Sequence, residues 1–277
     1  MSTIAGIIAM LGIGLLAGFL GSLLGIGGGI IVTPFITVIL GVDIKYAIAA
    51  SIIVVIATST GSTINYLKEN ILNLRVAMFL EIFTTIGALI GALLVGIVSP
   101  QLLYAIFGCF LLFSAFNMIR NLKDNLIKKS SPLALKLKLN GSYYDKSLNK
   151  QINYGVEKVP LGSAVMFIAG IASGLLGIGS GPFKVIAMDT VMKLPLKVST
   201  STSNLMMGVT AAASAVVYFF NGQIQCDIAV PIVLGVVGGS IIGTKVMPHI
   251  KPKVLHIIFI PVLVLFSVSM IVKAFGA

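Results

Sequence analysis

Residues 23–29 read LLGIGGG and residues 175–181 read LLGIGSG, and both stretches interrupt long hydrophobic segments. Glycine weakens a helix because it frees the backbone and lowers helix propensity. Within a bilayer, broken backbone is tolerated only where protein buries it or where it lines a wet cavity. Matching breaks in two halves of a chain are typical of the binding sites of secondary transporters. The two glycine breaks therefore predict both the architecture and the site.

The two breaks belong to a longer internal duplication. A shift of 152 residues pairs Tyr66 with Tyr218 and Pro100 with Pro252. The same shift pairs Lys45 with Lys197, Ser51 with Ser203, Thr58 with Thr210, Gly87 with Gly239, Gly91 with Gly243, and Phe107 with Phe259. Polar, glycine and proline residues would rarely match by chance, so we predict two homologous repeats.

The composition is that of a membrane protein. The chain has 277 residues, of which 57% are hydrophobic and only 10% are charged, whereas a soluble domain carries about 25% charged residues. Several apolar runs approach the ~20 residues that cross a bilayer as a helix. We predict an all-α polytopic protein that spans the cell membrane several times. Residues 1–24 lack a basic start and a clear cleavage site, so we expect this segment to be retained.

Both halves divide in the same way. We predict a first transmembrane repeat at 1–120, a basic cytoplasmic linker at 121–160 and a second transmembrane repeat at 161–277. Each repeat should contain a glycine-broken helix pair followed by three transmembrane helices. The expected segments are 4–24, 30–41, 44–67, 74–98 and 101–120, then 161–177, 182–192, 196–220, 228–247 and 253–275. Within the linker, residues 121–139 are compatible with a short amphipathic helix.

The orientation of the repeats depends on the broken pair. A re-entrant hairpin, or two tilted crossings, returns the chain to its starting side and makes the repeats inverted. One long kinked crossing would make them parallel. The positive-inside rule favours inversion, because that arrangement places Lys68, Arg75 and Lys251 on the cytoplasmic side with the linker.

The formal charge of +11 does not indicate a nucleic-acid partner. Nine of the 19 basic residues fall between Arg120 and Lys158, which is typical of a cytoplasmic loop near anionic lipid headgroups. The thiols of Cys109 and Cys226 have no CxxC spacing, and no cluster of metal ligands or nucleophile with a base is present. We therefore expect no metal, no cofactor and no enzymatic activity. The sequence carries no signal for an oligomeric state.

Lys184 is the foremost candidate for an anion ligand. It follows the second break in Gly181-Pro182-Phe183-Lys184, at the start of a half-helix whose N–H groups also favour negative charge. A lysine at this depth is costly unless it is paired or hydrated. The alternatives are an ion pair with Asp189, or a side chain that extends to the membrane surface.

The glycine breaks and a polar run complete the predicted binding site. The breaks would expose backbone N–H groups, although small residues also allow helices to cross closely. The run from Ser199 to Asn204 offers hydroxyl and amide groups, which could equally cap or link helices. The predicted substrate-binding residues are Gly25, Gly27, Gly28, Gly29, Ser51, Thr58, Gly177, Gly179, Ser180, Gly181, Lys184, Thr202, Ser203, Asn204 and Thr210.

Glu81 is the candidate for proton coupling. It lies about two turns inside the segment 74–98, and a buried carboxylate carries protons readily because burial raises its pKa. The alternative is a carboxylate bonded near the membrane surface to Arg75 or Lys68. The counterparts of Lys184 and Glu81 in the other repeat are Val32 and Val233.

These motifs resemble the sulfite exporter TauE/SafE family, also called the toluene sulfonate uptake permease family. The resemblance rests on GFLGSLLGIGGGIIVTP at Gly18–Pro34, on SGLLGIG at Ser173–Gly179, and on Ser199–Asn204. It implies transport of small anions, often organosulfur compounds such as sulfite, sulfoacetate or sulfonates, with coupling to protons. The family's glycine motifs fall on the glycines of both breaks. Its Thr-Ser motif falls on Thr202 and Ser203, where the first repeat has Ala50 and Ser51.

We therefore expect a secondary transporter of a small anion, organosulfur or sulfite-like, with alternating access at a midplane site between the two breaks. An anion channel or a membrane subunit that transports nothing is the alternative. Because Lys184 and the polar run belong to the second repeat alone, we expect the site to be asymmetric.

Overall fold

A computed structural model describes residues 4–25, 27–120, 130–146, 148–249 and 252–275. The first repeat contains α1 (Ile4–Leu24), α2 (Gly29–Pro34), the π-helical turn η1 (Phe35–Ile39), α3 (Ile44–Lys68), α4 (Leu74–Val95) and α5 (Pro100–Arg120). The second contains α7 (Val159–Leu176), α8 (Gly181–Ile186), the π-helical turn η2 (Ala187–Val191), α9 (Leu196–Phe220), α10 (Cys226–Val246), the 3-10 turn η3 (Met247–His249) and α11 (Pro252–Phe275). The predicted segments and the break in each repeat are confirmed.

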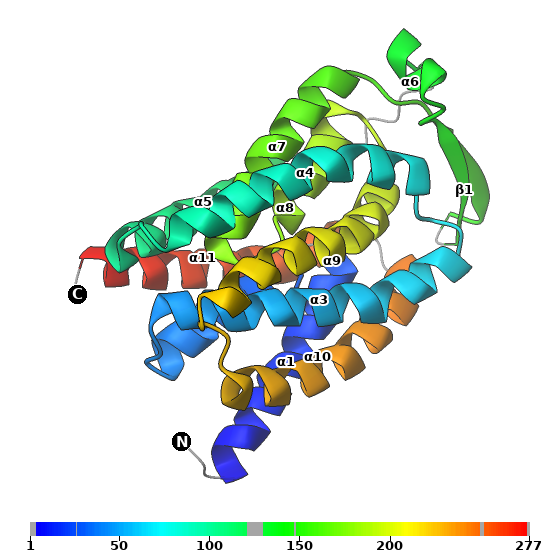
Figure 1. Ribbon diagram of the computed structural model, residues 1–277. Coiled ribbons are helices and arrows are strands. Elements are labelled where there is room, and N and C mark those ends of the chain that lie inside the picture. Colours follow the sequence, from blue (N-terminus) through cyan, green and yellow to red (C-terminus); the bar gives the residue numbers. More distant parts are fainter. Residues whose placement is uncertain (1–3, 26, 121–129, 147, 250–251, 276–277) are drawn as a thin grey trace.

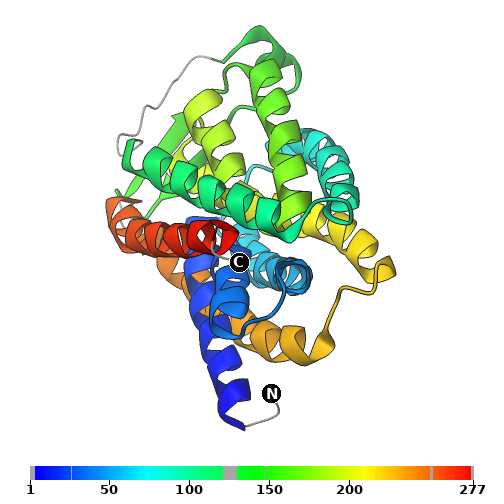
Figure 2. The ribbon, with the colours of Figure 1, turned by 90° about the vertical axis from the view of Figure 1, so that its left-hand side faces the viewer.

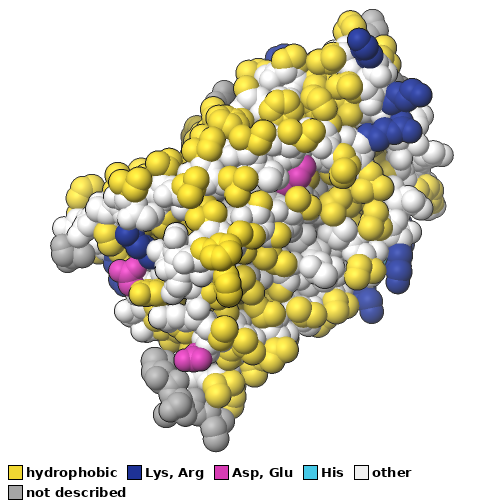
Figure 3. All heavy atoms as spheres, in the orientation of Figure 1, with side chains coloured by type: hydrophobic (Ala, Val, Ile, Leu, Met, Phe, Trp, Pro, Cys, Tyr) yellow, Lys and Arg dark blue, Asp and Glu magenta, His cyan; other side chains and the backbone are white. Residues whose placement is uncertain are grey.

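The helices have the length and surface of a membrane protein. Within the described residues, six helices are long and apolar enough to cross a bilayer, namely α1, α3, α4, α7, α9 and α10. Large apolar side chains such as Leu93 and Leu234 are about two-thirds exposed, as expected where lipid replaces water. Hydrophobic side chains cover the middle of the molecule in Figure 3, and most of the visible Lys and Arg side chains gather at its right-hand end. The protein is a multi-pass membrane protein of the cell membrane.

The linker contains a β-hairpin that was not predicted from the sequence. Strand β1 (Gly141–Asp145) pairs antiparallel with β2 (Lys150–Tyr154), from Gly141 opposite Tyr154 to Asp145 opposite Lys150. The predicted helix over 121–139 is shorter in the described part, since α6 covers only Pro132–Lys136. The Ser131 hydroxyl caps the start of α6, and Lys138 takes a left-handed φ of 52° soon after its end. Residues 121–129 lie outside the described part of the chain.

Helices from different repeats pack together in pairs. Helix α1 lies along α10, and its counterpart α7 lies along α4, while α3 packs against α9 and α5 against α11 (Figure 1). Helix α3 also contacts α10, and α9 contacts α4. We call α1, α3 and α10 the first bundle and α4, α7 and α9 the second bundle. Each bundle therefore combines helices from both repeats.

Glycines allow this close pairing, and they do so reciprocally. A Cβ on Gly18 of α1 would lie 2.2 Å from the carbonyl oxygen of Val236, and a Cβ on Gly170 of α7 would lie 2.2 Å from that of Thr84. These two contacts are related by the 152-residue shift with the partners exchanged. Two tyrosines show the same relation, since Tyr66 donates to the carbonyl of Ser22 and Tyr218 to that of Gly174, both at 2.7 Å.

The equivalent helices α3 and α9 run in opposite directions. The end of α3 and the start of α9 both reach the linker hairpin, through the pairs Glu69–Lys146 and Lys197–Asp145. The broken pair of the second repeat also begins and ends at this end of the molecule, because the N–H of Glu157 donates to the carbonyl of Met192 at 3.0 Å. Figure 2 looks onto the opposite end, where α1 begins and α11 ends. The chain therefore returns to the end at which the pair began, as either a re-entrant hairpin or two tilted crossings requires, and inversion relative to a bilayer stays a prediction.

Two neighbouring glycines of α10 test the close pairing of α1 with α10. A Cβ at Gly239 would lie 2.0 Å from the carbonyl oxygen of Leu15, whereas a Cβ at Gly238 would meet nothing within 4 Å. We expect Gly239→Ala to destabilise the protein by about 1–3 kcal/mol, because backbone must move. Gly238→Ala should be neutral or stabilising by up to about 1 kcal/mol, through helix propensity. Thermal denaturation in detergent measures both, and equal midpoints for the two variants would contradict this packing.

Candidate functional site

The two glycine breaks meet at the centre of the molecule. A Cβ on Gly29 would lie 2.9 Å from the carbonyl oxygen of Gly177. A Cβ on Gly27 would lie 3.2 Å from the sulfur of Met207, and one on Gly179 would lie 2.6 Å from a methyl carbon of Val55. Val55 and Met207 are themselves counterparts in the two repeats. The breaks that the sequence pairs by position are therefore also neighbours in space.

Backbone conformation explains most of the glycines in the breaks. Gly25, Gly27, Gly177 and Gly179 have φ between 66° and 74°, in the left-handed region that glycine adopts at no steric cost. Ser180 is the exception, since this buried serine has a φ of 50° whereas its counterpart Gly28 has −71°. Left-handed backbone costs a non-glycine residue about 1–2 kcal/mol. The remaining predicted glycines, Gly29 and Gly181, are the first residues of α2 and α8.

Ser203 links the two breaks. This fully buried residue of α9 places its hydroxyl 2.8 Å from the carbonyl oxygen of Gly25 and 3.4 Å from that of Gly181. The single hydroxyl proton serves one acceptor at a time, and the shorter distance favours Gly25. A side chain of the second bundle thus holds the broken backbone of α1, in the first bundle.

Asn204 makes a second polar connection between the bundles. Its Nδ2 donates to the carbonyl of Ser22 on α1 and to that of Thr200, each at 3.1 Å, and its Oδ1 accepts from Ser62 of α3 at 3.2 Å. All three hydrogen bonds are buried. Asn204 therefore links helices in this conformation, and a ligand would have to replace at least one of these bonds.

Lys184 is completely buried on α8 and is paired across helices. Its Nζ donates to the Thr210 hydroxyl on α9 at 2.5 Å and lies 3.6 Å from Oε2 of Glu81 on α4. Lys184 thus forms its ion pair with a carboxylate of the other repeat, and Asp189 lies in η2, beyond α8.

Glu81 completes this polar cluster, which consists of Lys184, Thr210 and Glu81. Its Oε1 accepts from Thr210 at 2.5 Å and from Thr85 at 3.1 Å, while Oε2 accepts from Thr84 at 2.9 Å. The carboxylate is therefore held inside the second bundle, and Arg75 instead donates to the carbonyl of Lys138. The alternative in which Glu81 pairs with Arg75 or Lys68 near the membrane surface is wrong.

The cluster breaks the symmetry of the repeats. Lys184 and Glu81 correspond to Val32 and Val233. Thr58 and its counterpart Thr210 each lie 2.9 Å from a carbonyl oxygen of their own helix, and Thr210 in addition contacts both charged side chains. The buried Lys184–Glu81 pair therefore occurs once among the described residues, and two valines occupy the positions related to it by the 152-residue shift. All three residues were predicted from the sequence but not as neighbours, because Glu81 and Thr210 are 129 positions apart.

Three further predicted residues, Ser51, Thr58 and Thr202, also lie outside this cluster. The Ser51 hydroxyl is 2.6 Å from that of Thr33, within the first repeat. Thr58 lies beside Gly28, and Thr202 accepts from the N–H of Asn73 at 3.1 Å, near the linker. Conversely, Thr84 and Thr85 were not predicted as site residues, although their position one turn after Glu81 was the available signal.

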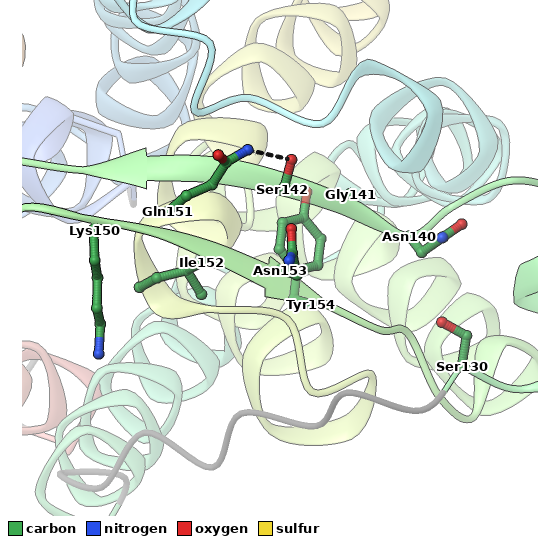
Figure 4. A pocket seen from close by; sticks show the side chains of 9 residues that line it. All are labelled: Ser130, Asn140, Gly141, Ser142, Lys150, Gln151, Ile152, Asn153 and Tyr154. Atoms are coloured by element: carbon green, nitrogen blue, oxygen red, sulfur yellow. Dashed lines mark hydrogen bonds between the residues drawn. The ribbon is translucent and has the colours of Figure 1, made fainter.

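The predicted site is closed to solvent. Ser180, Lys184, Ser203, Asn204 and Thr210 each have 0% exposure. A hollow of about 760 Å³ occurs instead on the linker hairpin, where Gln151 donates to Ser142 (Figure 4). It is lined by Ser130, Asn140, Gly141, Ser142, Lys150, Gln151, Ile152, Asn153 and Tyr154. None of these belongs to the predicted site, so the hollow is a feature of the linker.

Substitutions in the buried Lys184–Glu81 pair should change the stability of the protein. Lys184→Met leaves the Glu81 carboxylate buried without its cation, which costs about 3–5 kcal/mol when a buried pair loses one partner. Lys184→Met combined with Glu81→Gln removes both charges and should recover most of that loss. Thermal denaturation in detergent compares the single and double variants. A double variant less stable than Lys184→Met alone would show that the two charges do not compensate each other.

Comparisons with known proteins agree with this architecture. The family model "Sulfite exporter TauE/SafE" matches residues 10–270. The chain is 26% identical to the "Probable membrane transporter protein YunE" of Bacillus subtilis strain 168, over 94% of this chain and 95% of that protein. It is 28% identical to the "Probable membrane transporter protein MJ0441" of Methanocaldococcus jannaschii, over 94% and 93%. No solved structure matches the chain significantly. The chain belongs to the sulfite exporter TauE/SafE family of membrane transporters.

Proposed function

We propose that this protein is a secondary transporter of a small anion, sulfite-like or organosulfur, which binds between the two glycine breaks. The observation that carries the proposal is Lys184, a fully buried cation directly after the second break. An intramembrane lysine is costly and usually serves a pathway or a ligand. The family description supplies the substrate class, because it names sulfite export.

Ser203 and the neighbouring backbone would bind the anion's oxygens. Ser203 already lies within hydrogen-bond distance of both breaks, at Gly25 and Gly181. A sulfite or sulfonate group has three oxygens, which can accept from Lys184 and from Ser203 at once. Charge-assisted hydrogen bonds of this kind are about twice as strong as neutral ones.

Glu81 would couple the anion to a proton. In the closed conformation the Glu81 carboxylate forms an ion pair with Lys184, and the Thr210 hydroxyl connects the two through hydrogen bonds. A proton on Glu81 would remove that competing charge and leave the ammonium group available to the anion. Proton and anion would then bind together, and both would leave together when Glu81 loses its proton and re-forms the ion pair.

The two bundles, rather than the two repeats, would be the moving units. The hydrogen bonds of Ser203 to Gly25 and of Asn204 to Ser22 and Ser62 join the first bundle to the second. Lys184, Glu81 and Thr210 instead lie on α8 and the second bundle and would move as one body. If the repeats are inverted across the bilayer, rocking of the bundles opens the site alternately to each side.

Flux into proteoliposomes tests the substrate and the role of Lys184. We expect saturable uptake of sulfite or sulfoacetate, driven by a gradient. Lys184→Ala should reduce the initial rate about 10- to 100-fold, because a charge-assisted hydrogen bond is worth about 1.5–3 kcal/mol. Lys68→Ala, which removes an exposed lysine at the end of α3, is the matched control. Non-saturable flux would indicate a channel, and absence of flux a non-transporting subunit.

A second experiment isolates the role of Glu81. With Glu81→Gln, an imposed pH gradient should no longer drive net uptake, because the site cannot exchange a proton. Exchange of internal for external anion at equal pH should persist, since Lys184 is then permanently free of its counter-charge. Uptake by Glu81→Gln that still follows the pH gradient as in wild type would exclude this residue as the proton carrier.

A further inference from the structure

The body of the linker hairpin is anchored on the second bundle. Asp145 accepts from the ammonium of Lys197 on α9 at 2.8 Å, and both residues are more than nine-tenths buried. Tyr143, Ile152 and Tyr154 form an apolar face within the same cluster as the first turns of α4 and α9. An isolated two-stranded hairpin is marginally stable in water, so this docking holds it in place.

The polar contacts of the hairpin body reinforce the same anchoring. Asn73, directly before α4, donates through Nδ2 to the carbonyl of Leu139 at 2.8 Å and to the Tyr154 hydroxyl at 3.0 Å. Burial raises the pKa of that tyrosine hydroxyl, which keeps it a neutral partner for the amide.

The tip of the hairpin reaches the first bundle through a much weaker contact. Lys146 lies 2.5 Å from Glu69, which directly follows the end of α3, and the two side chains are 40% and 34% exposed. Exposed ion pairs contribute little because water and salt screen them. The hairpin is therefore fixed to one bundle and loosely tied to the other. In Figure 1 strand β1 lies across the right-hand end of the molecule, between α6 and the end of α3.

The hairpin lies over the nearest end of the interface between the bundles. Lys197 precedes Ser203 by six positions on α9, which corresponds to about 9 Å along a helix. Thr200 lies between them and is 4% exposed, and a Cβ on Gly25 would lie 2.5 Å from its carbonyl oxygen. Thr200 therefore lies between the residue that anchors the hairpin, Lys197, and the first break at Gly25.

We propose that the linker hairpin is a one-sided gate, which moves with the second bundle and is tied shut by the Lys146–Glu69 pair. The proposal rests on the proposed function, in which the bundles separate to admit substrate. The counterpart of Glu69 at the opposite end is Asn221, which is uncharged, and the linker occurs only once in the chain. The opposite end of the molecule therefore lacks the equivalent ion pair, and we expect the site to open more readily toward that end.

Cysteine accessibility tests the gate without any substrate. Thr200→Cys is introduced after the exposed native thiols are removed by Cys109→Ala and Cys226→Ser. A charged, water-soluble methanethiosulfonate reagent is then applied to the purified protein in detergent. We expect slow modification with the native hairpin and about tenfold faster modification with Lys146→Glu, because that charge repels Glu69. Combining Lys146→Glu with Glu69→Lys should restore the slow rate.

Lys150→Glu is the matched control, since it reverses an exposed charge on the same hairpin and should leave the rate unchanged. Ser62→Cys repeats the measurement from the first bundle, and size-exclusion chromatography verifies that each variant is folded. Modification of Lys146→Glu at the native rate at both positions would overturn the gate, as would a charge-swapped pair that stays fast. If native protein transports no anion, the proposed function fails, while the accessibility results still decide whether the hairpin controls entry.

Discussion

The fold depends on one constraint, which is that broken backbone inside a membrane must be covered by protein. Each glycine break exposes peptide groups that neither lipid nor its own helix can satisfy. In this molecule the breaks cover one another, with Gly29 against Gly177 and with Val55 and Met207 filling the space between them. Ser203 holds the carbonyl of Gly25 in the same place. The contacts that close the centre are therefore the same contacts that bring the proposed binding residues together.

Cross-packing of the repeats follows from how the helices approach each other. Helix α1 lies against α10 and α7 against α4 because glycines bring their backbones into contact. The result is a pair of bundles that each contain helices from both halves of the chain. A duplicated sequence has thus produced two bodies that are mixtures of the repeats, and movement between them would shift Ser203 and Asn204 relative to α1 and α3.

Two asymmetric additions distinguish the second bundle from the first. One is the buried cluster of Lys184, Thr210 and Glu81. The residues related to these three by the 152-residue shift are Val32, Thr58 and Val233, which carry no charge. The other is the linker hairpin, whose buried Asp145–Lys197 pair joins it to the start of α9. The counterpart of Lys197 in the first repeat is also a lysine, Lys45, but Lys45 is more exposed than Lys197. The duplication therefore produces two similar bundles, and the charged cluster and the hairpin are both associated with the second of them.

The sequence by itself determined the membrane class, the duplication, the position of the helices within each repeat and the location of both breaks. These follow from hydrophobicity, glycine and proline, which act locally and leave a direct trace in the chain. The tertiary structure alone decided that Lys184 pairs with Glu81, because that contact joins α8 of one repeat to α4 of the other. It also decided that the linker forms a hairpin, since two short strands are ordered by the surface on which they dock. Partners distant in the sequence, and elements too small to be stable alone, are fixed by packing, and packing leaves no periodic signal in the chain.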